Sequence, residues 1–265
     1  MKTTNLPIGV FDSGLGGLTV LNALKNILPH ESFIYFGDTA HVPYGNKSKD
    51  SIVQFSQAII HFLESQPVKL IVVACNTVSS IALNKIKTQT PIISVLDPID
   101  DYFSTNKNLR LSVGIIGTEN TIQSQSYVRL INKLNANITI YSQPCPLLVP
   151  IIEEGLEDHA ITKIILMEYL ESFKKQNISL LILGCTHYPV IKKIIQQILG
   201  KKVVIFDSAQ STAVCVNNFL IKNKLLYKNL RPVINLYVSD NDIKFKFLSK
   251  KFLIYQINLI KKIQI

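Results

Sequence analysis

The sequence predicts an α/β protein of two pseudo-symmetric domains, each with a mostly parallel sheet flanked by helices. Short apolar runs of strand length alternate with stretches of helical periodicity. Several runs are apolar throughout, which is typical of strands covered by helices on both faces. Two look-alike segments far apart in the chain each place a cysteine, Cys75 or Cys185, directly after such a run. This repetition indicates a coarse duplication of one α/β unit.

The apolar runs predict nine strands, each ending in or beside a turn signal. They span residues 8–11, 33–36, 70–74, 92–95, 113–116, 138–141, 180–183, 203–206 and 233–238. Apolar residues at helical spacing predict helices at 17–28, 51–63, 162–173 and 190–199. A last helix is expected from 242 to about 263, with Phe245, Leu248 and Phe252 on its apolar face and lysines on a solvated basic face.

The chain is expected to pass between the two domains twice. Pro98 restricts Asp97 to extended geometry, so the chain is expected to leave the first domain there. It is expected to return at Asp207. The first domain is thus predicted at 1–97 plus 207–265 and the second at 98–206.

Composition narrows the class of protein. Hydrophobic residues make up 47% and charged residues 17% of 265, so the chain can bury a core and is not disordered. The net charge of +10 invites a nucleic-acid interpretation, but the lysines form no clustered basic motif. No nucleic-acid partner is therefore expected.

The sequence also indicates where the protein is located in the cell and the redox state of its cysteines. No signal peptide precedes the first strand, and no run has the roughly 18 apolar residues of a membrane span. The four cysteines lack metal-site spacing such as C-x-x-C, so no metal is expected. A cytoplasmic protein with free thiols and no membrane partner is the expectation.

A glycine-rich segment follows the first strand and opens a helix. It reads Asp12-Ser13-Gly14-Leu15-Gly16-Gly17. Glycines allow close backbone approach to a ligand, and a helix amino end attracts anions. The dinucleotide fingerprint fails because Thr19 stands where its last glycine belongs. A tight strand-to-helix turn is the alternative, but Asp12 and Ser13 at the strand's carboxyl end favour a site.

Cys75 and Cys185 are the strongest candidates for chemistry. Buried structural cysteines are common, and that interpretation fits Cys145 and Cys215. Cys75 and Cys185 instead precede expected helix starts, where a helix amino end lowers the thiol pKa from about 8.5. His187 can exchange a proton with a neighbouring thiol. Two thiols from matching halves have the arrangement needed to invert a carbon centre.

Further polar residues indicate the kind of ligand. Thr118 and Thr121 follow another expected strand and can face the same cleft. Hydroxyls and backbone amides of this kind suit a small carboxylate. No cofactor motif appears, so none is expected.

These segments resemble the glutamate racemase family, within the aspartate/glutamate racemase superfamily. The matching stretches run in order over about the first three quarters of the chain. They are Phe11-Asp12-Ser13-Gly14-Leu15-Gly16-Gly17, Gly37-Asp38-Thr39-Ala40-His41-Val42-Pro43-Tyr44-Gly45, Ala74-Cys75-Asn76-Thr77, Gly117-Thr118 with Thr121, Val149-Pro150-Ile151-Ile152-Glu153-Glu154-Gly155 and Gly184-Cys185-Thr186-His187-Tyr188-Pro189.

The resemblance implies a site in the cleft between the domains and cofactor-independent interconversion of L- and D-glutamate, supplying D-glutamate for peptidoglycan. By position, it makes Cys75 and Cys185 the two acid/base residues, acting on D- and L-glutamate respectively. Asp12, Glu153 and His187 are the assisting groups, with Glu154 as the alternative to Glu153. The substrate-binding residues it implies are Asp12, Ser13, Tyr44, Gly45, Asn76, Thr77, Thr118, Thr121, Thr186 and His187.

The resemblance also sets expectations about partners. The family often dimerises, so a homodimer is expected. A cell-wall precursor regulates some members, which leaves such a regulator open here.

Three alternative functions stay open at this point. One is racemisation of aspartate or another amino acid. Another is a hydrolase with Cys185 as nucleophile and His187 as base, which leaves Cys75 without a role. The last is a non-catalytic, basic binding protein.

Overall fold

The computed structural model describes residues 3–105, 111–135, 137–240 and 242–264. Its first sheet has the strand order β10-β9-β2-β1-β3-β4, and every pairing in it is parallel. The strands are β1 (Ile8–Asp12), β2 (Phe33–Gly37), β3 (Leu70–Val73), β4 (Ile92–Ser94), β9 (Ile234–Val238) and β10 (Leu259–Lys262).

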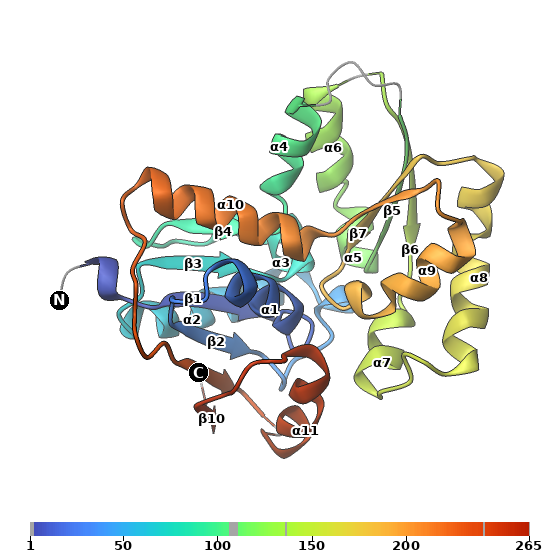
Figure 1. Ribbon diagram of the computed structural model, residues 1–265. Coiled ribbons are helices and arrows are strands. Elements are labelled where there is room, and N and C mark those ends of the chain that lie inside the picture. The colour runs from blue at the N-terminus through green and yellow to red at the C-terminus, as the bar shows by residue number, and fades with distance from the viewer. Residues whose placement is uncertain (1–2, 106–110, 136, 241, 265) are drawn as a thin grey trace.

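The second sheet has the order β6-β5-β7-β8 and is also parallel. Its strands are β5 (Ser112–Gly117), β6 (Thr139–Pro144), β7 (Leu180–Gly184) and β8 (Val204–Phe206). The nine expected strands correspond to β1–β9, and the predicted α/β fold class is confirmed. Figure 1 shows the two sheets in separate lobes, with both chain ends near the first.

Helices cover both faces of each sheet. Those on the first sheet are α1 (Leu18–Ile27), α2 (Lys49–Ser65), α3 (Asn76–Ile81), α10 (Ser208–Lys222) and α11 (Asp242–Phe252). Those on the second are α4 (Pro98–Thr105), α5 (Glu119–Gln123), α6 (Ser126–Leu134), α7 (Leu148–Glu153), α8 (Ala160–Lys175) and α9 (Lys192–Leu199). Short 3-10 turns lie at Thr3–Asn5, Tyr44–Asn46, Leu83–Lys85 and Tyr188–Ile191.

The all-apolar strands owe their composition to this double covering. All five residues of β1 and of β7 are buried. In the first sheet, Val10 faces the core under α1 and α10, whereas the next residue, Phe11, faces the core under α2 and α3. Strand side chains alternate between faces, so both faces must be apolar when both are covered.

The two lobes meet along loops that follow the carboxyl ends of the strands. Thr19 Oγ1, at the start of α1, donates to the carbonyl oxygen of Thr186, in the loop after β7, at 2.9 Å, so this bond joins the two lobes. The strands of the first sheet lie before residue 98 and after residue 207, and those of the second lie between. The domain boundaries at 97/98 and 206/207 stay a prediction.

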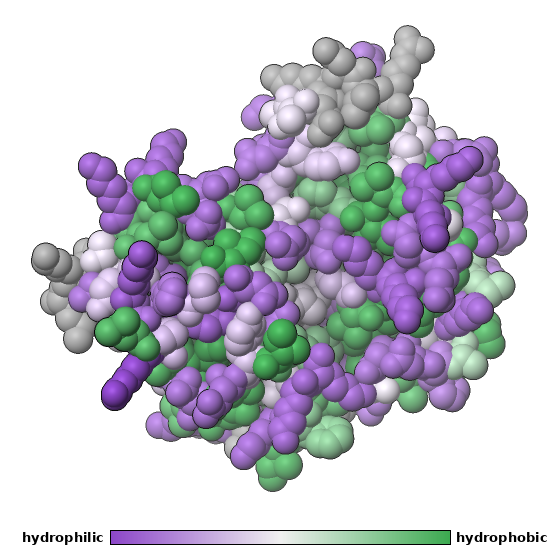
Figure 2. Space-filling model, in the orientation of Figure 1, coloured by the Kyte–Doolittle hydropathy of each residue, from purple (hydrophilic) through white to green (hydrophobic). Residues whose placement is uncertain are grey.

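The expected C-terminal helix is wrong beyond residue 252. The helix α11 ends at Phe252, and the chain then returns as β10, which pairs with β9. Lys250 therefore lies on a helix but Lys261 and Lys262 lie on an edge strand, so they share no basic helix face. Figure 2 shows hydrophilic side chains spread over most of one face of the molecule. Within the described ranges, no helix is long and apolar enough to cross a membrane.

Candidate active site

Cys75 and Cys185 line the same small cavity between the two sheets. Each follows the carboxyl end of a central strand, β3 for Cys75 and β7 for Cys185, and both side chains are buried. The cavity has a volume of about 20 Å³. A space of this size holds about one water molecule, so the two thiols face a closed site.

Cys75 occupies the N-cap position of α3, and its thiol lies 3.6 Å from Ser13 Oγ. Burial and the nearby charge of Asp12 together raise the pKa of Cys75 to about 12, against hydrogen bonds with Val78 and Ser13 that lower it. We expected the helix amino end to lower this pKa. That expectation was wrong because loss of hydration in the closed cavity outweighs the helix end.

Cys185 has a different neighbourhood. Its Sγ lies 3.7 Å from His187 Nδ1, and His187 Nε2 lies 2.9 Å from Glu153 Oε1. Burial lowers the pKa of His187, but the bonds to Cys185 and Glu153 outweigh burial and raise this pKa well above its usual range. The imidazole therefore favours its cationic form beside the Cys185 sulfur.

Asp12 lies behind the cavity wall, fully buried at the end of β1. It accepts a hydrogen bond from the Gly14 amide at 3.0 Å and one from Thr186 Oγ1 at 3.4 Å. Burial raises the pKa of Asp12, while His187 and the amides of Gly17 and Gly14 oppose the rise. Asp12 thereby fixes the glycine-rich loop of the first sheet against the Cys185 loop of the second.

Three threonine hydroxyls meet on the side of Cys75. Thr118 Oγ1 lies 3.0 Å from both Thr77 Oγ1 and Thr121 Oγ1. Asn76, in the same wall, accepts a hydrogen bond from the Tyr127 hydroxyl. These groups form a polar surface that a carboxylate or ammonium group can bind.

The loop after β2 closes the cavity from another side. The Tyr44 hydroxyl donates to the buried carboxylate of Asp38, which also accepts from Ser239 Oγ at 2.6 Å. Asn120 of α5 donates to the carbonyl oxygens of Tyr44 and Lys47 at 3.0 and 2.9 Å. This loop of the first sheet is therefore held to the second sheet's helices.

Most of the candidate site residues line the cavity itself. Those that do are Ser13, Tyr44, Gly45, Cys75, Asn76, Thr77, Thr118, Cys185, Thr186 and His187. The three others, Asp12, Thr121 and Glu153, each contact a lining residue. The carboxylate that reaches His187 is that of Glu153.

Several residues around the cavity were not singled out from the sequence. Val42, Pro43 and Val149 line it, and they stand inside the motifs quoted above. Asp38 and Tyr127 fix lining residues from behind. Tyr127 gave no sequence signal because it belongs to an apolar helix face and meets Asn76 only through tertiary packing.

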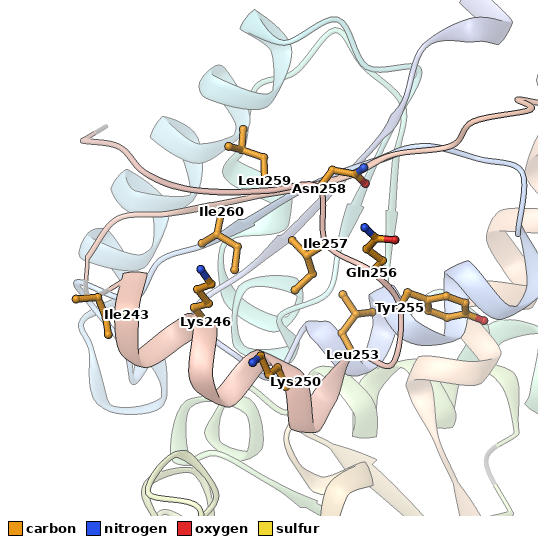
Figure 3. Close-up of a pocket in the computed structure, with 10 residues that line it drawn as sticks. All are labelled: Ile243, Lys246, Lys250, Leu253, Tyr255, Gln256, Ile257, Asn258, Leu259 and Ile260. Atoms are coloured by element: carbon orange, nitrogen blue, oxygen red, sulfur yellow. The ribbon is translucent and has the colours of Figure 1, made fainter.

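A larger cavity of about 630 Å³ lies between α11 and β10, away from the thiols. Figure 3 shows Lys246 and Lys250 of α11 facing Ile257 and Ile260 across it. It contains none of the candidate site residues. Across the part of the chain described, no group of three or more His, Cys, Asp or Glu side chains is placed to hold a metal ion.

Comparison with known proteins defines the class. The Asp/Glu/Hydantoin racemase family matches residues 9–216. The chain therefore belongs to the Asp/Glu/Hydantoin racemase family, and the resemblance read from the motifs is confirmed.

Individual relatives within this family have more specific names than the family itself. A glutamate racemase of Neisseria meningitidis is 43% identical over 252 residues, covering 93% of this chain and 92% of the relative. One of Syntrophus aciditrophicus is 40% identical over 262 residues, covering 98% and 97%. The crystal structure of glutamate racemase from Francisella tularensis in complex with D-glutamate has a TM-score of 0.91 at 42% identity and covers 98% of each chain. The chain is accordingly an amino-acid racemase, an isomerase.

Proposed function

We propose that this enzyme interconverts L- and D-glutamate without a cofactor, with Cys75 and Cys185 as two bases on opposite faces of the α-carbon. The observation that carries the proposal is that both thiols line one small cavity between the sheets. The relatives at 40% and 43% identity favour glutamate over aspartate. We further propose that the D-glutamate supplies peptidoglycan synthesis.

Cys75 and Cys185 have different surroundings, and this difference fits the conversion of L-glutamate to D-glutamate. The Cys185 thiolate removes the α-proton from one face, and the Cys75 thiol gives its proton to the other. Cys75 suits the donor role because its pKa of about 12 keeps it protonated at neutral pH. Cys185 suits the base role because the His187 cation lies 3.7 Å from its sulfur. The step leaves Cys185 protonated and Cys75 ionised, which is the state needed for D to L.

The carbanionic intermediate needs stabilisation from the polar walls. Hydroxyls of Ser13, Thr77 and Thr118 line the cavity and can bind the substrate's carboxylates, and a cavity of this size leaves little room for water. A preorganised donor of this kind is worth about 3 kcal/mol at a developing oxyanion. Several such donors acting together lower the barrier to removing the α-proton.

Binding requires the site to open. Glutamate is much larger than the one water molecule that the cavity holds, so the loops must separate to admit it. The contacts that join the lobes, from Thr19 to Thr186 and from Asn120 to Tyr44, must loosen during this motion. Closure around the substrate then brings the two thiols to its opposite faces.

The remaining expectations belong to the same proposal. We propose a cytoplasmic homodimer with no nucleic-acid or membrane partner. Regulation by a cell-wall precursor stays a prediction from the family resemblance.

Incubation of pure L- and pure D-glutamate in D₂O tests the proposed function. Each enantiomer is expected to lose optical rotation and to gain deuterium at the α-carbon. Hydrolysis, or loss of rotation for aspartate but not for glutamate, would contradict the proposal.

A further inference from the structure

Helix α11 of the first lobe contacts the second lobe through its last two residues, Lys251 and Phe252. The Phe252 ring lies nearly perpendicular to the imidazole of His187, with the ring centroids 6.5 Å apart and the planes at 84°. Lys251 Nζ donates to Glu157 Oε1 at 2.8 Å, in the segment between α7 and α8. In Figure 1, α11 lies on the side of the first lobe that faces α7. Two consecutive residues of one lobe therefore contact the part of the other that carries His187 and Glu153.

The contact with Phe252 limits how the His187 imidazole can move. Both side chains are buried. The imidazole has Cys185 Sγ beside its Nδ1 and Glu153 Oε1 beside its Nε2. Rotation of the imidazole out of this plane would break both contacts, and an aromatic ring packed against it opposes that rotation. The apolar ring also keeps water from competing for the two nitrogens.

Lys251 holds α11 against the segment that follows Glu153. The Glu157 side chain is only 15% exposed, and its second oxygen, Oε2, is buried without a hydrogen-bond partner among the described residues. Gly155 has a φ of +74°, and a Cβ there would lie 3.1 Å from Lys251 Nζ, so the missing side chain leaves room for the ammonium group. Loss of Lys251 would leave a largely buried carboxylate without this counter-charge. The ion pair therefore favours the position of α11 seen here.

The rest of α11 and the residues after it are anchored to the first lobe. Phe245 packs on Tyr35 of β2 with ring centroids 6.3 Å apart, and the Tyr255 hydroxyl donates to Asn26 of α1. Another face of α11 borders the cavity of about 630 Å³ seen in Figure 3. Because α11 is fixed to one lobe and His187 belongs to the other, the contact between Phe252 and His187 depends on closure of the lobes.

We propose that Phe252 is a positioning residue for His187, and that the ion pair between Lys251 and Glu157 holds α11 where Phe252 can act. This inference rests on the proposed function, in which His187 acts beside Cys185. Phe252 does not line the cavity that holds the thiols, so its effect on the reaction passes through His187. Closure of the lobes around the substrate then fixes the imidazole at the same time as it brings the thiols into place.

The ring-nitrogen NMR signals of His187 test the positioning without relying on racemisation. The full chain labelled with ¹⁵N-histidine contains five histidines, and His187→Asn identifies the signals of this one by their loss. Phe252→Leu keeps apolar bulk but removes the ring, and it is expected to shift and broaden both nitrogen signals as the imidazole loses its fixed orientation. Phe245→Leu removes a buried ring near the other end of α11 and is expected to leave them unchanged. Unchanged His187 signals in Phe252→Leu would overturn the proposal.

A double-mutant cycle separates positioning from general support of the fold. Phe252→Leu is expected to lower kcat for glutamate about tenfold, because His187 is misplaced, and to change KM by less than about twofold. In the His187→Asn background the same change is expected to cost nothing further, because the ring on which Phe252 acts is gone. An equal loss of kcat in both backgrounds would show that Phe252 only supports the fold, and would overturn the proposal.

Lys251→Gln tests the ion pair that holds α11. The pair is partly exposed, so its loss is expected to lower kcat only about threefold and to broaden the same His187 signals. Lys250→Gln removes the same charge one residue earlier, from the face of α11 that borders the cavity, and is expected to match wild type. Equal losses in the two variants would contradict the role of the ion pair. If wild type does not racemise glutamate, the proposed function fails, and the His187 signals alone decide the positioning.

Discussion

His187 Nε2 lies 2.9 Å from Glu153 Oε1, and the other nitrogen of the same ring lies beside Cys185. Glu153 ends α7, while His187 follows β7, so tertiary packing of the second sheet brings them together. The carboxylate thereby favours an imidazolium next to one thiol. Cys75 has a hydroxyl, Ser13, as its neighbour instead. The two bases are therefore tuned by different groups.

Glu153→Gln is expected to slow L-to-D turnover by about tenfold to a hundredfold, because His187 loses the carboxylate that favours its cation. The pKa of His187 falls without this partner, so the imidazolium deprotonates at lower pH. The alkaline limb of the L-to-D pH–rate profile is therefore expected to move to lower pH. Glu154→Gln, one residue along and exposed, is the matched control. An unmoved profile in Glu153→Gln would remove Glu153 from the mechanism.

Gly16→Ala is expected to displace the Cys185 loop. A Cβ at this position would lie 2.4 Å from His187 Nδ1 and 2.5 Å from Thr186 Oγ1, so both side chains must shift. A misplaced base costs about a hundredfold in kcat. Gly9→Ala is the control, because its Cβ would make ordinary contacts at 3.5 Å. Steady-state kinetics of both variants check this. A near-normal kcat in Gly16→Ala would contradict the close approach of Gly16 to Thr186 and His187.

Cys75 is expected to make folding less stable at alkaline pH. Burial raises its folded pKa from 9.0 to about 12, so above pH 9 the unfolded chain releases this proton while the folded chain keeps it. Its contribution to stability is therefore present below pH 9 and is lost as pH rises, by about 1.4 kcal/mol per pH unit.

Urea unfolding at pH 8, 9 and 10 measures this effect as the difference between wild type and Cys75→Ser. The variant is expected to lose less stability than wild type above pH 9. The difference should change by roughly 0.3 kcal/mol from pH 8 to 9 and by roughly 1 kcal/mol from pH 9 to 10. Parallel losses up to pH 10 would show that the thiol is hydrated in the folded protein.

The central strands and their functional ends were predictable from local sequence. Five buried residues in β7 require a continuous apolar run, and the polar residues after Cys185 mark where that run stops. Parallel strands bring such ends to one edge, so the candidates could be named before their contacts were known.

Other features depend on long-range contacts that local patterns do not encode. Apolar residues continue past Phe252 in the sequence, but Asn258 accepts a hydrogen bond from the Ile234 amide, and Leu259 then pairs with Asn235. A short apolar run fits a helix or a strand until its partner is known. The Cys75 pKa was likewise misjudged because burial depends on how tightly the lobes close.

Racemisation by Cys75→Ala and Cys185→Ala, followed from each pure enantiomer of glutamate by circular dichroism, tests the two-base mechanism most directly. Each variant lacks the proton donor or acceptor on one face, so racemisation in both directions is expected to be abolished in both. Correct folding is checked by unfolding curves. Substantial turnover by either variant would contradict the assignment of one thiol to each face of the α-carbon.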